Sequence, residues 1–212
     1  MDILGLVISF AYIFLLLFVS TFIAKKDGEL SRKFVHVGVA NWWIFVIIFF
    51  ENVILASILP AVFIILNYIS YKKNIFSSIE REEKDSLGTV YYVVSCLILT
   101  IVSFVYFENM LFAGIGIFAM GYGDGFAAIF GDKFKSKEYK ILGQKKTLIG
   151  SIAMFIFTFA AISILTLALG EFVLLGMLLI AVFATVIEAV SPYGIDNLTV
   201  PLLTTLIAYL IL

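Results

Sequence analysis

The sequence has few charged residues and almost none of the residues that build disulfides or cysteine-based metal clusters. Charged side chains make up 14% of the 212 residues and hydrophobic ones 63%, whereas a water-soluble domain has about 25% charged and about 45–50% apolar residues. A water-soluble globular protein is therefore not expected, and the bilayer is the expected solvent. The single cysteine, Cys96, excludes a disulfide framework and a cysteine metal cluster.

Apolar runs that are long enough to cross a bilayer fill most of the chain. A membrane-spanning helix needs about 20 apolar residues, so the chain has room for seven or eight such helices. The pattern predicts an all-α, polytopic membrane helix bundle that forms one integral-membrane domain over residues 1–212. The run that starts at Ile3 has no basic segment before it and no cleavage site, and is expected to be a retained helix. The predicted spans are 3–24, 34–50, 52–71, 88–107, 109–131, 147–169, 171–190 and a short one at 198–212.

The basic residues are distributed asymmetrically between the connections. All 14 lysines and arginines fall in the connections after the first, third and fifth spans, whereas the opposite connections carry acidic residues only. Because basic residues near helix ends face the cytoplasm, the three basic connections are predicted to be cytoplasmic and the N-terminus to lie outside. No internal repeat is visible, which argues against an inverted-repeat transporter.

A first polar cluster, "SRKFVHVG" at residues 31–38, opens the second span. Ser31 is expected to cap that helix. Arg32 and Lys33 lie four and three residues before His36, so the three side chains share one helical face. Two alternatives stay open here: the cations snorkel to lipid headgroups, or the histidine is a packing residue.

The connection "EREEKDSLGTVYY" at residues 80–92 is expected to be mostly a solvated loop, with a helix starting at Gly88 and Thr89. Glu83 and Asp85 are weaker candidates for contacting a metal or a lipid.

The segment "GYGDGFAAIFGDKFKS" at residues 121–136 places Asp124 inside an apolar span. Asp124 and Gly131 are two helical turns apart and share a face with Ala127 or Ala128, and small residues on a face allow close approach of a backbone or a ligand. The carboxylate is expected about 10–12 Å from the end of the span. An unpaired charge there costs several kcal/mol, so it indicates a functional site; the alternative is a structural ion pair with a nearby cation.

The segment "LGQKKTLIGS" at residues 142–151 precedes the sixth span. Thr147 is the expected N-cap, and Gly150 keeps the first helical turn uncluttered. Lys145 and Lys146 beside the free amides of a helix N-terminus predict a phosphate-binding site. The segment is not a Walker A loop, because the upstream glycine is missing.

The chain also has acidic and amide side chains near its end. Glu188 lies at the close of the seventh predicted span, and Asp196 and Asn197 follow in the next connection. Such oxygen atoms suit Mg²⁺, which takes a few protein oxygens plus phosphates, and Glu188 near Asp124 would complete a metal-phosphate site. The alternative for Glu188 is a polar residue at a helix end. Together these groups indicate a membrane-embedded enzyme that handles a phosphorylated substrate with a divalent metal.

Five motifs in this order, "SRKFVHVG", "LGTVYY", "GDGFAAIFG", "KKTLIGS" and "IEAVSPYGIDNLTVP", span residues 31–201. The set resembles the CTP-dependent lipid kinase family, which includes phytol kinase, dolichol kinase and the CTP-using diacylglycerol kinase. The resemblance implies transfer of the γ-phosphate of a nucleotide, usually CTP, to a lipid alcohol, with Mg²⁺ as cofactor. The implied partners are a lipid alcohol from the bilayer and a nucleoside triphosphate from the cytoplasm, and no nucleic acid; the pattern indicates no oligomeric state.

The resemblance also implies residue roles in a single catalytic domain. It matches three family elements: Arg-Lys-x-x-His, Asp-x6-Gly and Lys-Thr-x-x-Gly, followed by a C-terminal Glu and Asn. The implied catalytic residues are Asp124, Lys146 and His36; the phosphate-binding residues are Arg32, Lys33, Gly131, Lys145, Thr147 and Gly150; and the metal ligands are Asp124, Glu188 and Asn197. The chain departs from the family at Ile149, where a glutamate is frequent, and has only a loose equivalent, lysines 133–137, of a Gly-Lys pair.

Two other functions are weighed against the kinase. A phosphatidate cytidylyltransferase, which is related in chemistry, would transfer CMP to a lipid phosphate, but its closing His-Gly-Gly and Asp-Arg-x-Asp signature is absent. A transporter would carry ionisable residues through the whole membrane, whereas here they gather at one face. Both comparisons favour the kinase.

Overall fold

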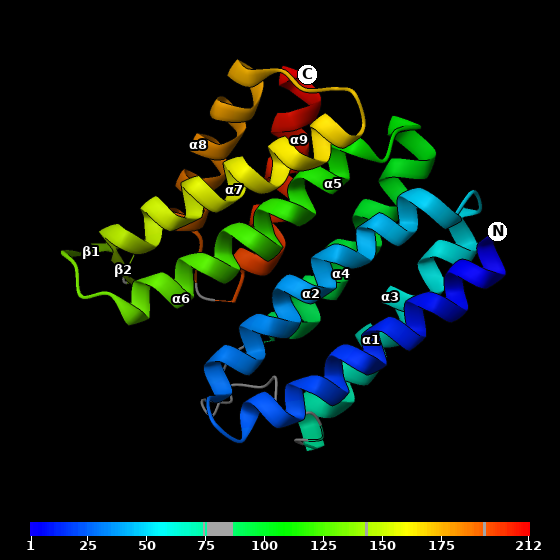
Figure 1. The fold of residues 1–212 in the computed structure, drawn as a ribbon, viewed down its shortest axis with the longest axis horizontal. Helices are drawn as coiled ribbons and strands as arrows, with labels where there is room; N and C mark the ends of the chain where they lie inside the picture. The colour runs from blue at the N-terminus through cyan, green and yellow to red at the C-terminus, as the bar shows by residue number, and fades with distance from the viewer. Residues whose placement is uncertain (74, 76–86, 143, 193) are drawn as a thin grey trace. The chain divides into compact units, whose positions relative to one another are not determined.

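The computed structural model describes residues 1–73, 75, 87–142, 144–192 and 194–212 (Figure 1). The chain divides into two compact units, Met1–Met110 and Leu111–Leu212. The predicted contributors Glu83 and Asp85 lie outside the described residues. The first unit contains α1 (Asp2–Ala24), α2 (Gly28–Phe49), α3 (Val53–Lys73), α4 (Gly88–Val102) and the π-helix η1 (Ser103–Phe107). The second contains α5 (Leu111–Phe118), the π-helix η2 (Ala119–Asp124), α6 (Gly125–Lys133), β1 (Glu138–Ile141), β2 (Gln144–Thr147), α7 (Leu148–Ala168), α8 (Leu174–Val190) and α9 (Asp196–Ile211).

The prediction of a polytopic, all-α membrane bundle is confirmed. In the part of the chain that the structure describes, six helical segments are long and apolar enough to cross a membrane: those starting at Asp2, Gly28, Val53, Gly88, Leu111 and Leu148. The apolar helices α8 and α9 have 17 and 16 residues and are shorter than a typical span. Large apolar side chains on the outside of the helices, such as Ile3, Ile54 and Leu210, are mostly exposed, as expected for lipid-facing surfaces.

In the first unit, α2 begins earlier than the sequence predicted. Asp27 is its N-cap, and the Asp27 carboxylate accepts a hydrogen bond from the Leu30 amide at 2.9 Å. Ser31 was predicted as the cap, and this is wrong: Ser31 is buried one turn inside the helix, where its hydroxyl donates to the Ser20 carbonyl at 2.8 Å. Aspartate caps a helix as well as serine does, so the earlier residue starts the helix.

In the second unit, the continuous segment α5–η2–α6 packs against α7 and α9 through glycines. A Cβ atom on Gly116 would lie 2.3 Å from the Pro201 carbonyl oxygen of α9. A Cβ atom on Gly123 would lie 2.2 Å from Thr158 Oγ1 of α7. Contacts this short leave no room for any larger residue, so the glycines set how closely these helices approach.

The hairpin and the two π-helices were not expected from the sequence. β1 and β2 pair antiparallel, with Tyr139 opposite Lys146 and Lys140 opposite Lys145. Between the strands, Leu142 has a left-handed backbone (φ 48°). The hairpin lies directly before α7, so it holds the lysine segment that was predicted to bind phosphate (Figure 1).

Candidate functional site

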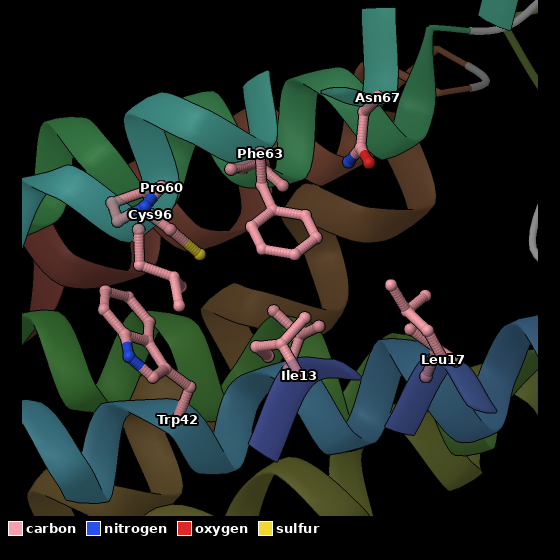
Figure 2. Close-up of a pocket in the computed structure, with 11 residues that line it drawn as sticks. Ile13, Leu17, Trp42, Pro60, Phe63, Asn67 and Cys96 are labelled. Carbon is pink, nitrogen blue, oxygen red and sulfur yellow. The ribbon is translucent and has the colours of Figure 1, made fainter. Parts of the chain in front are cut away.

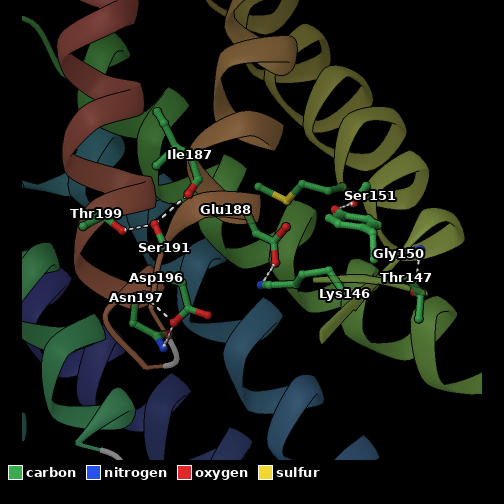
Figure 3. Close-up of polar contacts among 12 residues, drawn as sticks. Lys146, Thr147, Gly150, Ser151, Ile187, Glu188, Ser191, Asp196, Asn197 and Thr199 are labelled. Atoms are coloured by element: carbon green, nitrogen blue, oxygen red, sulfur yellow. Dashed lines mark hydrogen bonds and ion pairs between the residues drawn. The ribbon is translucent and has the colours of Figure 1, made fainter. Parts of the chain in front are cut away.

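A largely buried ion pair joins β2 to α8 in the second unit. The Lys146 ammonium donates a hydrogen bond to Oε1 of Glu188, and Figure 3 shows the two side chains pointing toward each other. The side chains are only 17% and 7% exposed. Charges with so little access to water are stable only when they are paired, so each of these two residues depends on the other.

Two further carboxylates act on the same ammonium group. Burial by itself lowers the pKa of Lys146, but the charge and hydrogen bond of Glu188, followed by the charges of Asp196 and Asp124, outweigh it and leave the pKa raised above 10.5. Lys146, Glu188, Asp196 and Asp124 therefore form one electrostatic group, which we call the acidic cluster. All three carboxylates raise the pKa of the Lys146 ammonium, so in this cluster the protein's negative charge favours a cation.

Asp124 reaches this cluster from an irregular part of its helix. It is the last residue of η2, and it is buried, with 8% of its surface exposed. A π-helical turn contains one more residue than an α-helical turn, and such turns are frequent at functional sites. The sequence places Asp124 inside an apolar span, but it does not predict the π-helical turn that the residue closes.

Contacts between the hairpin and the start of α7 fix the position of β2. The Leu148 amide donates to the Lys137 carbonyl at 3.0 Å, and the Ile149 amide donates to the Ser136 hydroxyl at 3.2 Å. Tyr139 and Ser151 share a hydrogen bond between their hydroxyl groups. None of these contacts was predicted, because each depends on the unforeseen hairpin.

The predicted N-cap and the predicted small-residue face are confirmed as local structure. Thr147 accepts a hydrogen bond from the Gly150 amide at 3.1 Å and caps α7. A Cβ atom on Gly131 would lie 2.8 Å from Thr147 Oγ1 and 3.5 Å from the Gly150 Cα, and one on Gly150 would lie 3.2 Å from the Ala127 carbonyl oxygen. Gly131 and Gly150 thus let α6 and α7 touch beside the lysine strand.

Lys145 does not join Lys146. Successive side chains of a strand point to opposite faces, and Lys145 is exposed, with its ammonium 3.6 Å from a Glu138 carboxylate oxygen. The structure therefore brings only one of the two predicted phosphate-binding lysines to the acidic cluster.

Asn197 holds Asp196 in place. Its side-chain amide donates to Asp196 Oδ1 at 3.0 Å and to the Gly194 carbonyl at 3.3 Å, and its backbone amide also donates to Asp196 Oδ1 (Figure 3). Asp196 was noted in the sequence but not chosen as a site residue. Its carboxylate, next to Asn197, acts on Lys146 together with those of Glu188 and Asp124.

A metal would need ligands from outside the protein as well. Within the residues that the structure describes, no three His, Cys, Asp or Glu side chains lie close enough to hold a metal ion by themselves. Mg²⁺ is usually bound through one or two carboxylates together with substrate phosphates and water. The carboxylates of the acidic cluster fit that second kind of site.

Arg32, Lys33 and His36 belong to the first unit. The Arg32 guanidinium makes two hydrogen bonds to the Glu29 carboxylate one turn before it. Lys33 is buried, with 3% of its surface exposed. The His36 ring stacks on the Tyr92 ring at a centroid distance of 4.5 Å, and the Tyr92 hydroxyl donates to the His36 carbonyl at 3.3 Å. All three residues lie in the first half of α2, and a shared face for their side chains stays a prediction.

Comparison with known proteins finds relatives along most of the chain. A phytol kinase of Synechocystis sp. is 31% identical over 195 residues, which cover 88% of this chain and 81% of that protein. A probable chloroplastic phytol kinase of Triticum aestivum is 33% identical, covering 86% of this chain and 67% of that protein. Phytol kinase 1 of Arabidopsis thaliana, also chloroplastic, is 33% identical, with 86% and 66% covered. No family model and no solved structure matches the chain.

Proposed function

The chain belongs to the phytol kinase family, and on that premise we propose that it is a membrane-embedded kinase that transfers the γ-phosphate of a nucleotide to an isoprenoid alcohol. CTP is the proposed donor, as the family motifs imply. The observation that carries the proposal is the acidic cluster: a buried lysine held by Glu188, with Asp124 and Asp196 acting on the same ammonium.

This cluster suits phosphoryl transfer because that reaction depends on positioning and charge. Lys146 supplies positive charge to the phosphates of the nucleotide, and Glu188 keeps its ammonium oriented. Gly131 and Gly150 let α6 pack against the start of α7. The first amides of α7 already donate to Lys137, Ser136 and Thr147, so Lys146 is the group that attracts the phosphates, together with the positive end of the helix dipole.

Asp124 is the proposed group that orients the acceptor alcohol. The reaction forms a bond between the alcohol oxygen and the γ-phosphorus, and breaks the bond between that phosphorus and the oxygen bridging to the β-phosphate. The hydroxyl proton passes to the carboxylate, and the nucleoside diphosphate leaves. A carboxylate is suited to this step because it can accept the hydrogen bond, and then the proton, of the attacking hydroxyl.

Mg²⁺ is the proposed cofactor, and Asp124 and Glu188 would hold it together with Asn197, as the family motifs imply, and with the phosphates of the nucleotide. When bound, it would neutralise charge on the β- and γ-phosphates. Mg²⁺ is usually bound through one or two carboxylates together with substrate phosphates, so the proposed metal would arrive as the nucleotide complex.

The proposed site faces the cytoplasm, because the hairpin carries the third group of basic residues. Arg32, Lys33 and His36 keep their predicted roles: the first two bind phosphates or a lipid headgroup, and His36 acts in catalysis. The variants Arg32→Met, Lys33→Met and His36→Gln should each reduce phosphate transfer to the alcohol.

The experiment that tests the proposal is transfer of label from nucleotide to phytol by the purified protein. With γ-labelled CTP, label should enter the lipid; with α-labelled CTP, it should not. Asp124→Asn should abolish transfer, whereas Asp132→Asn, an exposed aspartate at the end of the same helix, should leave it intact. Label entering from the α-position would indicate a nucleotidyl transferase, and unchanged activity in Asp124→Asn would contradict the assigned role.

A further inference from the structure

The apolar pocket among the described helices of the first unit is too small to hold a lipid molecule. Figure 2 shows side chains that line it, among them Trp42, Phe63 and Asn67. Its volume is about 50 Å³, whereas small-molecule sites have roughly 300–1,000 Å³. Lipid contacts are better supported at an outer surface of the second unit, where the hairpin of β1 and β2 lies.

The hairpin lies at a surface of the membrane. The helical segments before and after it, Leu111–Lys133 and Leu148–Ala168, are each long and apolar enough to cross a membrane. Residues 134–147 join them and contain both strands, which lie beside the end of α6 and the start of α7 (Figure 1). Because each strand has four residues and extends only about 14 Å, the hairpin stays within reach of the lipid headgroups.

The two faces of the hairpin carry different side chains, since side chains alternate between the faces of a strand. One face carries Tyr139 and Lys146, which bond to side chains of α7 and α8, so this face is turned toward the protein. The other face, which we call the outer face, carries Lys140 and Lys145. These two lysines are exposed and lie directly opposite each other. Like charges in opposite positions repel, so an anion bound by both lysines would stabilise this arrangement.

Positive charge exceeds negative charge around the outer face. The exposed charged residues of the segment 132–147 are five lysines and two acids, which leaves three positive charges in excess: Lys133, Lys135, Lys137, Lys140, Lys145, Asp132 and Glu138. A Glu138 carboxylate oxygen lies 3.6 Å from the Lys145 ammonium, and exposed pairs of this kind are weak. A surface with this excess of positive charge attracts an anionic partner.

Large apolar side chains are exposed beside these lysines. Leu142, which follows β1, is 75% exposed, and Phe134, which follows α6, is 45% exposed. The Leu142 backbone is left-handed, with φ 48°, a conformation that costs free energy for a residue other than glycine. Apolar side chains next to lysines are typical of segments that lie in the membrane interface. A soluble anion such as a nucleotide would use the lysines but would leave Leu142 and Phe134 in water.

We propose that the hairpin docks on the bilayer: the lysines of the outer face bind anionic lipid headgroups, and Leu142 and Phe134 enter the layer beneath them. Lys140 and Lys145, as opposite neighbours, contact the same headgroup phosphate. The burial of apolar area and the attraction of the lysines act together. Because β2 carries Lys146 on its other face, a docked hairpin also holds the acidic cluster near the level of the headgroups. The inference does not depend on the proposed function.

The first test measures the insertion of Leu142. Leu142→Cys is labelled with an NBD fluorophore in nanodiscs that contain phosphatidylglycerol; Cys96 is buried and stays unlabelled. The label should be quenched by lipids that carry a spin label near the headgroup and should be protected from aqueous iodide. A label at Glu171→Cys, an exposed site after α7, is the control and should respond equally with and without phosphatidylglycerol. Quenching of the Leu142→Cys label by iodide and not by spin-labelled lipid would overturn the inference.

The second test measures lipid preference and needs no label. Native mass spectrometry of the protein titrated with phosphatidylglycerol or with phosphatidylcholine gives an affinity for each lipid. A lysine near an anionic surface strengthens binding by about fivefold, so Lys140→Gln/Lys145→Gln should weaken phosphatidylglycerol binding on the order of 10- to 30-fold. Binding of phosphatidylcholine should not change. Lys25→Gln/Lys26→Gln, which removes two exposed lysines after α1, is the matched control and should have little effect.

The second test has three outcomes that would contradict docking on anionic lipid. They are equal affinity of the wild type for both lipids, equal losses in the two double variants, and displacement of phosphatidylglycerol by CTP with Mg²⁺. The last result would assign the outer face to the nucleotide instead. Neither test uses turnover, so failure of the docking surface leaves the kinase proposal untouched, and failure of the kinase proposal leaves the docking surface in place.

Discussion

The ion pair between Lys146 and Glu188 allows a quantitative prediction, because the charge that remains in the buried site depends on which of the two partners is removed. Lys146→Met removes the ammonium with which Glu188 is paired and on which Asp196 and Asp124 act, whereas Glu188→Gln leaves the ammonium with Asp124 and Asp196 still acting on it. Breaking a buried pair from one side costs about 3–5 kcal/mol, and we expect Lys146→Met to fall in that range. Glu188→Gln should cost only about 1–3 kcal/mol, close to the loss of a buried hydrogen bond.

The free energy of unfolding is measured by denaturant titration of the purified protein in detergent micelles. The double variant Lys146→Met/Glu188→Gln should be more stable than Lys146→Met alone, because one of the uncompensated charges is gone. Lys145→Met is the matched control: its side chain is 77% exposed, and exposed pairs contribute about 0–1 kcal/mol. Equal losses for Lys146→Met and Lys145→Met, or a larger loss for Glu188→Gln than for Lys146→Met, would refute the reasoning.

Three further predictions concern the second unit and the membrane orientation. The pKa of Lys146 is raised in the folded protein. The stabilisation that Lys146 contributes is therefore complete below pH 10.5, its ordinary pKa, and is lost as the pH rises through the higher folded pKa. Unfolding titrations at several pH values should show this alkaline loss of stability in the wild type and not in Lys146→Met. Gly131→Ala should destabilise the protein, because its Cβ would meet Thr147 Oγ1 at 2.8 Å. In a Thr147→Ala background the same change should stabilise the protein by about 0.5–1 kcal/mol, which is the helix preference of alanine over glycine. The unfolding free energies of the wild type, the two single variants and the double variant test this. In intact cells an impermeant thiol reagent should label Glu171→Cys and not Lys140→Cys, and the reverse pattern would contradict a cytoplasmic hairpin.

The sequence predicted the regular parts of the structure well. The spans followed from hydrophobicity, and the Thr147 cap and the contact surface of Gly131 followed from residue type and spacing. These features depend on residues within a few positions of one another, which is the range over which helix periodicity and capping act. The early start of α2 was missed because Asp27 and Ser31 both satisfy the capping pattern, and only the burial of Ser31 against the Ser20 carbonyl separates them.

The hairpin was missed for a physical reason. Its strands have four residues each, and β2, "QKKT", has none of the apolar alternation that indicates a strand. The turn also lacks the Asn-Gly or Asp-Gly pair that marks a tight hairpin. The residues just before β1, Ser136 and Lys137, are held by the first amides of α7, and Tyr139 of β1 is held by Ser151 of α7. Such contacts exist only after the helix has packed, so a local pattern does not announce them.

The acidic cluster was predicted in part: its residues were recognisable in the sequence, but their arrangement was not. Each of its members lies where regular structure ends: Asp124 closes a π-helical turn, Lys146 lies in the hairpin, Glu188 is in the last turn of α8 and Asp196 opens α9. In a helix interior the backbone groups bond to one another and the side chains follow the regular helical repeat. Helix ends leave backbone groups unsatisfied, and a π-turn inserts one residue, so side chains at these places do not follow the repeat. The sequence could therefore identify these residues as polar exceptions to an apolar background, but not how they meet. Their meeting depends on two irregular features that flank α6. The π-helix η2, before α6, ends at Asp124, and the hairpin, after α6, carries Lys146, which pairs with Glu188.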